Sequence, residues 1–134
     1  MAIRIKLFQK KDTNKNIDGK WYGRVVKRDE VHTKELARSI SHNTTLTEAD
    51  VQAAIIALVE EMKLRLQGGD TVVLDGFGRF RLSVHSEMVS NRDDYNLKKH
   101  VTRIFCKFVP AATRNPFDRH LERPFVDGTE LQRV

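Results

Sequence analysis

The stretch from Thr47 to Leu66 is the feature that most limits how this chain can fold. Thr47 can cap a helix, with Asp50 as the return partner of a capping box three residues later. Apolar residues then follow the three-and-four spacing of one helix face: Val51, Ala54, Ile55, Leu58, Val59, Met62 and Leu66. A second apolar strip adds Ala53, Ile56 and Ala57. One short helix and a small sheet cannot cover so much apolar surface, so the pattern favours self-association over a monomer closed by its N-terminal residues.

The remaining patterns predict an α+β chain. Alternating residues at 3–7, a polar loop at 12–20 and a second strand at 21–28 predict an N-terminal β-hairpin. Helical spacing begins at Thr33 and should stop near Asn43, and Gly68-Gly69 ends the second helix. Three strands are predicted after it, at residues 71–74, 79–85 and 101–109, with a polar irregular stretch at 87–100. The tail from Arg114 has little periodicity, beyond a possible last strand or docked extension near Phe125.

The net charge of +6 is distributed unevenly along the chain. Residues 1–34 hold ten Lys and Arg against four Asp and Glu, residues 35–78 hold three against seven, and residues 79–134 hold eleven against seven. Two basic segments around an acidic one favour a molecule whose positive side meets a polyanion such as a nucleic acid. The N-terminus lacks the apolar run of a signal peptide, and no stretch approaches the length of a membrane span, so we expect a cytoplasmic protein without a membrane partner.

Sequence motifs for catalysis or metal binding are absent. The stretch LDGFGRFRL, residues 74–82, has Arg81 where a dinucleotide fingerprint needs its third glycine, and a strand follows it where a phosphate loop needs a helix. The five histidines show no ligand spacing, and the single Cys106 excludes a zinc site built from several thiolates. Asp93-Asp94 lies in a polar loop that gives its carboxylates no means of dividing acid and base roles. We therefore expect no enzyme, no metal, no cofactor and no small-molecule substrate.

Residues 33–110 resemble the bacterial HU/IHF histone-like DNA-binding proteins. The matching segments are 33–36 and 44–50 at the two helix starts, 74–80 at the glycine turn and 108–110 at the end of the third strand. The hairpin before them is similar to an HU-related subgroup with an N-terminal β extension. The resemblance implies an intertwined homodimer with a two-helix base, a three-stranded antiparallel sheet and a β-arm along the minor groove. The expected parts are the hairpin extension at 1–31, an HU/IHF-like DNA-binding domain at 32–114 and a C-terminal tail at 115–134.

Strand alternation gives the candidate binding face. If Phe80, Leu82 and Val84 face the core, the opposite face carries Arg79, Arg81, Ser83, His85, Arg103, Phe105 and Lys107. The resemblance makes that face the DNA surface, brings the glycine turn close to phosphates and adds basic residues near the arm. The predicted DNA-binding residues are Gly76, Gly78, Arg79, Arg81, His85, Lys98, Lys99, Arg103 and Lys107. The predicted dimer interface comprises Ile55, Leu58, Met62, Phe77 and Phe80.

The resulting hypothesis is a non-enzymatic, architectural, histone-like protein of the bacterial nucleoid that binds and condenses duplex DNA with low sequence specificity. The family's arm ends in an Arg-Asn-Pro tip whose proline wedges between base pairs, but the corresponding residues here, 91–94, are acidic and lack proline. We therefore expect less bending of the DNA. The alternative is an HU-fold protein repurposed for protein–protein interaction or assembly with little DNA binding, which the acidic tip and Phe105 on the outer face would favour.

Overall fold

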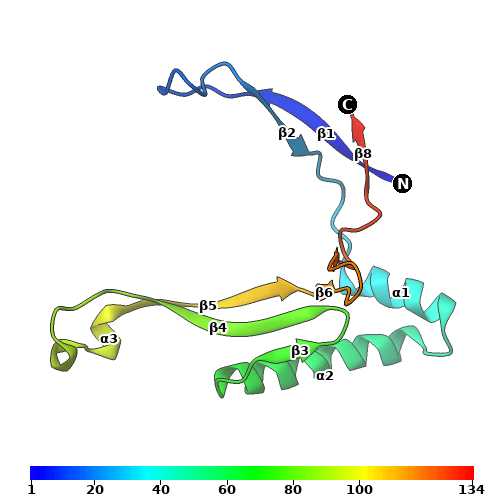
Figure 1. Cartoon of the computed structure of the whole chain (residues 1–134). Coiled ribbons are helices and arrows are strands. Elements are labelled where there is room, and N and C mark those ends of the chain that lie inside the picture. The colour runs from blue at the N-terminus through cyan, green and yellow to red at the C-terminus, as the bar shows by residue number, and fades with distance from the viewer. The chain divides into compact units, whose positions relative to one another are not determined.

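The computed structural model describes all 134 residues as a mixed α+β chain (Figure 1). The α+β class is therefore confirmed. The chain forms two compact units: unit 1 comprises Met1–His32 and Val126–Val134, and unit 2 comprises Thr33–Phe125. The prediction of one three-stranded sheet beside a separate hairpin is too simple, because the strands form three sheets. None of the helices combines the length and the apolar character needed to cross a membrane.

Unit 1 is built on the predicted hairpin, enlarged by the end of the chain. Strand β1 (Ala2–Gln9) pairs antiparallel with β2 (Trp21–Val25). On its other edge β1 pairs in parallel with β8 (Glu130–Arg133), which places Leu131 opposite Ile3. The short β8 has no clear alternation of apolar and polar residues. Its own sequence therefore does not predict a strand that pairs with β1.

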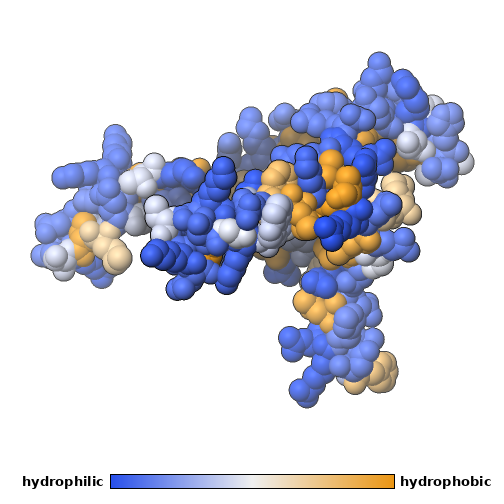
Figure 2. All heavy atoms as spheres, turned by 90° about the horizontal axis from the view of Figure 1, so that it is seen from above, coloured by the Kyte–Doolittle hydropathy of each residue, from blue (hydrophilic) through white to orange (hydrophobic).

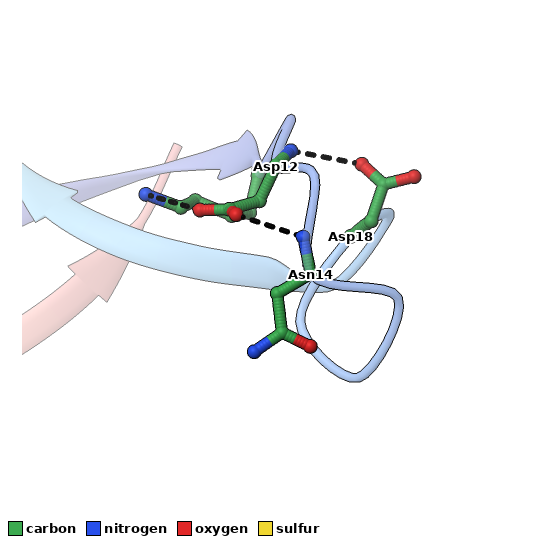
Figure 3. Close-up of polar contacts among 4 residues, drawn as sticks. Asp12, Asn14 and Asp18 are labelled. Carbon is green, nitrogen blue, oxygen red and sulfur yellow. Dashed lines mark hydrogen bonds and ion pairs between the residues drawn. The ribbon is translucent and has the colours of Figure 1, made fainter.

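The loop of this hairpin is held by its own polar side chains (Figure 3). The Asp12 carboxylate accepts a 3.0 Å hydrogen bond from the Asn14 N–H and forms a 3.5 Å ion pair with Lys10. The Asp18 carboxylate accepts a 3.0 Å hydrogen bond from the Asp12 N–H. Such side-chain-to-backbone bonds replace strand pairing where the chain reverses, so these aspartates stabilise the turn.

Unit 2 begins with two helices, α1 (Thr33–Asn43) and α2 (Glu48–Gln67). The predicted capping box is present: the Asp50 N–H donates to Thr47 Oγ1 at 3.1 Å, and the Thr47 N–H donates to Asp50 Oδ2 at 3.2 Å. The Thr47 hydroxyl also donates a hydrogen bond to Asp50 Oδ2. This bond is the larger cause, and the bond from the Thr47 N–H the smaller, of a pKa of the Asp50 carboxyl that lies below its ordinary value. As predicted, α2 ends at Gly68-Gly69, where Gly69 takes a φ of +95°.

The second sheet follows in the order β3-β4-β5, all antiparallel. Its strands are β3 (Val72–Leu74), β4 (Gly78–Ser86) and β5 (Val101–Pro110). The stretch between β4 and β5, predicted to be irregular, contains the 3-10 turn η1 (Arg92–Asp94) and the single-turn helix α3 (Leu97–His100). Asparagine side chains cap both turns, at Asn91 and Asn96. In the tail, β6 (Thr113–Arg114) and β7 (Leu121–Glu122) form a small third sheet.

A single copy of the chain has a very small core. Ala37 and Val51 are its only buried apolar residues. On α2, Ile56 remains 63% exposed and Leu64 66% exposed. Figure 2 shows apolar side chains gathered in surface patches among hydrophilic ones. One copy alone therefore leaves much of its apolar surface in water.

Candidate nucleic-acid interface

The two strands β4 and β5 bring basic residues from distant parts of the sequence onto one face. Their register places Arg81 opposite Lys107 and His85 opposite Arg103. Directly opposite residues share a face, and so do residues two apart on one strand, which adds Arg79. These exposed cations form what we call the basic face: Arg79, Arg81, Arg103 and Lys107. The alternation that the sequence predicted for these strands agrees with this register.

Phe105 lies on the basic face, where it contacts His85 and Arg103. Its ring stacks on that of His85, with centroids 4.9 Å apart and planes inclined by 26°. The guanidinium of Arg103 lies 5.0 Å from the centre of the same ring. Phe105 is half-buried in this arrangement. The ring therefore packs with two polar side chains and orients them, and it is not the freely exposed apolar residue that a protein-docking surface would offer.

The opposite face of the sheet is apolar and turns toward α2. Phe80, Leu82 and Cys106 from the strands line a groove of about 340 Å³ together with Val59 and Met62 of the helix. Among the other predicted interface residues, Ile55 is half-buried, Leu58 is 42% exposed and Phe77 is 46% exposed. The sheet thus separates a charged face from an apolar one.

The two glycines on either side of Phe77, where the turn leads into β4, differ in their surroundings. A Cβ on Gly78 would lie 2.4 Å from the Val109 carbonyl oxygen and 2.7 Å from the Phe108 ring, and φ here is +148°. Gly78 is buried, so the packing of β5 requires a glycine at this position. Gly76 takes a φ of +75°, with no atom within 4 Å of its missing Cβ. Of these two glycines, only Gly76 leaves its backbone open to an approaching ligand.

Phe77, between these glycines, anchors the turn through aromatic contacts. Its ring lies 5.8 Å from that of Phe80 and 5.7 Å from that of Phe108. Phe125, near the end of unit 2, packs edge-on against it at 5.7 Å. Phe125 is therefore a docked residue of the tail, close to where the sequence suggested a docked extension.

Two further residues predicted to bind DNA, Lys98 and Lys99, lie beyond the paired part of β4 and β5, which we call the β4–β5 ribbon. Lys98 and Lys99 are exposed on α3, which Figure 1 shows at the end of the ribbon away from α1. They are thus beyond the His85–Arg103 pair and do not join the four cations of the basic face.

His100, the last residue of α3, is buried. Its Nδ1 accepts a 2.8 Å hydrogen bond from the Asn96 N–H, and its carbonyl accepts one from the Glu87 N–H. The Tyr95 ring lies 5.3 Å away, and the Tyr95 hydroxyl is hydrogen-bonded to Ser86. His100 therefore closes the tip of the ribbon. The repeated Asn at 91 and 96, each able to cap a turn, was the available sequence signal for this structure.

Comparison with known proteins supplies the family. A search of the curated proteins finds no match. Among solved structures, a Bacteroides vulgatus protein that is provisionally described as a bacterial DNA-binding protein matches with a TM-score of 0.67 and 10% sequence identity. The match covers 99% of this chain but 48% of the other, so the chain spans about half the length of that protein. The model of the family HU-HIG, described as an HU domain fused to wHTH, Ig, or Glycine-rich motif, matches residues 1–113. Since this match covers most of its length, the chain belongs to the HU-HIG family.

Proposed function

We propose that this protein is a non-enzymatic, histone-like DNA-binding protein of the nucleoid that holds duplex DNA with low sequence specificity. The observation that carries the proposal is the basic face, where Arg79, Arg81, Arg103 and Lys107 share one side of strands β4 and β5. Membership of a family built on an HU domain supports it. So does the fold shared with a protein provisionally described as DNA-binding.

Low specificity follows from the chemistry of this face. Arginine and lysine contacts to phosphates fix a protein on the duplex but carry no information about sequence. In the connection between β4 and β5, Asn91 and Asn96 already use their side-chain oxygens to cap turns. Lys98, Lys99 and the open backbone at Gly76 would add phosphate contacts at the two ends of the ribbon.

A homodimer completes the proposal. The second copy would cover the apolar side of the sheet and α2, with Ile55, Leu58, Met62, Phe77 and Phe80 at or beside the interface. The groove along Met62 and Phe80 and the exposed apolar residues of α2 support this, because a monomer rarely leaves so continuous an apolar surface in water. Two copies would present two basic faces to one DNA molecule.

A random duplex should therefore bind strongly at low salt and weakly at high salt. The eight basic-face cations of the dimer, each neutralising one phosphate, would contribute about −7 to the slope of log K against log salt. Gel shift or fluorescence anisotropy between ~50 and ~200 mM salt measures it. An affinity that does not change with salt would contradict the proposal. A folded dimer that binds no duplex would instead favour a role in protein–protein interaction or assembly.

The bound duplex should bend little. Kinking requires an apolar wedge between base steps, and unstacking costs a few kcal/mol per step. The connection between β4 and β5 presents Asp93 and Asp94, both exposed, which phosphates repel, and only Met88, Val89, Tyr95 or Leu97 could substitute as the wedge. Fluorescence energy transfer between the ends of a ~30 base-pair duplex should change only slightly when the protein binds. A large gain in transfer at saturating protein would show that another residue serves as a wedge.

A further inference from the structure

Unit 1 carries most of the net charge of the protein, although it lacks the basic face. Its 41 residues hold ten Lys and Arg against six Asp and Glu, a net charge of +4. The larger unit 2 holds fourteen against twelve, a net charge of +2. The unit that holds the proposed duplex-binding residues therefore carries the smaller part of the net positive charge, and the net charge of unit 1 requires its own explanation.

One face of the unit 1 sheet combines these charges with aromatic rings. The β1–β2 register places Lys6 opposite Arg24 and Phe8 opposite Tyr22, and all four share a face. Arg4, two residues before Lys6, lies on the same side of β1. We call these five residues the aromatic-basic face.

The contacts within the aromatic-basic face bring the cations onto the rings. The Arg24 guanidinium lies 5.1 Å from the centre of the Tyr22 ring and 6.0 Å from that of Phe8. The Lys6 ammonium lies 5.7 Å from the Phe8 ring centre. The two rings lie side by side, 6.2 Å apart, and remain 39% (Phe8) and 37% (Tyr22) exposed. Cations and partly open ring surfaces therefore occur together on a single strand pair.

These rings are not needed to form the apolar side of the sheet. That side is made by Ile3, Ile5, Leu7, Val25 and Leu131, which alternate with the aromatic-basic face. Gly23 lies on the same side, opposite Leu7. A Cβ at this position would come within 2.7 Å of the Ile5 side chain, so the packing there leaves no room for one. Phe8 and Tyr22 point to the other side of the sheet, where both remain partly exposed.

We propose that the aromatic-basic face binds single-stranded nucleic acid, with unpaired bases stacking on Phe8 and Tyr22 and backbone phosphates meeting Arg4, Lys6 and Arg24. Open aromatic rings interleaved with cations are the combination by which proteins bind single strands without reading sequence. A duplex keeps its bases stacked inside and cannot offer their faces to these rings. This second site goes beyond the duplex binding proposed for unit 2 and uses different residues.

The test uses the full-length chain and two labelled probes, a ~20-nucleotide single strand of thymidines and a random duplex of equal length. Phe8→Leu with Tyr22→Leu should lower single-strand affinity at least about tenfold and leave duplex affinity unchanged, because two stacking surfaces are lost and no charge is removed. Arg4→Gln with Arg24→Gln should weaken single-strand binding and flatten its salt slope by roughly one unit. Val25→Thr, on the apolar side of the same sheet, is the matched control and should bind both probes as the wild type does.

The emission spectrum of Trp21, the only tryptophan, reports whether unit 1 stays folded in each variant. Wild-type affinity for the single strand in the Phe8 and Tyr22 double variant would overturn the proposal, as would an equal loss of affinity for both probes. Alanine replacement of the four basic-face residues should spare single-strand binding. If the duplex fails to bind the wild type while the single strand binds through Phe8 and Tyr22, the proposed function fails and this second site stands.

Discussion

Replacing Leu58 by lysine is expected to dissociate the proposed homodimer and to abolish the cooperative thermal unfolding of unit 2. Leu58 is 42% exposed in a single copy and lies in the apolar strip of α2 that the second copy is proposed to cover. In the dimer the new ammonium would be desolvated without a partner, which costs several kcal/mol. Light scattering at micromolar concentration and a circular dichroism melt measure the two effects.

The matched control is Glu60→Lys, which introduces the same ammonium at an exposed polar position two residues along the same helix. We expect this variant to remain dimeric and to melt close to the wild type, since a surface substitution usually shifts stability by about 0.5 kcal/mol or less. A wild-type protein that is a stable folded monomer, or a Leu58→Lys variant that remains dimeric, would contradict the assignment of this surface.

The expected loss is large because one copy has so little core of its own. With Ala37 and Val51 as the only buried apolar residues, each copy gains little from apolar burial until a second copy arrives. In the proposed dimer, folding and dimerisation would be one process, and the apparent stability would depend on protein concentration. The unfolding midpoint of the wild type should accordingly rise as the protein is concentrated.

Local rules explain which parts of the fold the sequence predicted well. The Thr47 capping box, the glycine pair after α2 and the strict alternation along β4 each depend on residues a few positions apart. Alternation separates an apolar from a polar side in each strand, and both apolar sides were expected to face the core, so the basic face could be predicted before the strand register was known. Its role in binding DNA came from the resemblance and stays a prediction.

Features that depend on distant residues were not predicted. The pairing of β8 with β1 joins the two ends of the chain, and nothing in the sequence of β8 specifies its partner. The tight packing around Gly78 comes from Val109 and Phe108 on another strand, so the sequence could not show that Gly78 is buried while Gly76 is open. The aromatic-basic face was missed for a different reason: the apolar alternation of Ile3, Ile5 and Leu7 indicates a strand whichever residues lie between them.

Replacing Arg79, Arg81, Arg103 and Lys107 together by alanine is expected to abolish the gel shift of a random duplex near physiological salt. The four exposed cations would otherwise neutralise up to about eight phosphates in the dimer, and counterion release from those contacts supplies most of the non-specific affinity. Any residual binding should show a much flatter salt dependence. Because the side chains point away from the apolar groove, the variant should keep the thermal stability and the dimeric state of the wild type.

The control for this variant removes the same charge elsewhere, by alanine at Lys11, Lys15, Lys27 and Lys34. If net charge alone attracted the duplex, both variants would lose affinity equally, and the assignment to the basic face would be wrong. If the face binds the DNA, the control should lose only the small long-range attraction, which salt screens over about 8 Å at physiological ionic strength. The difference between the two variants at one salt concentration therefore measures what the arrangement of charges on β4 and β5 adds to the charge itself.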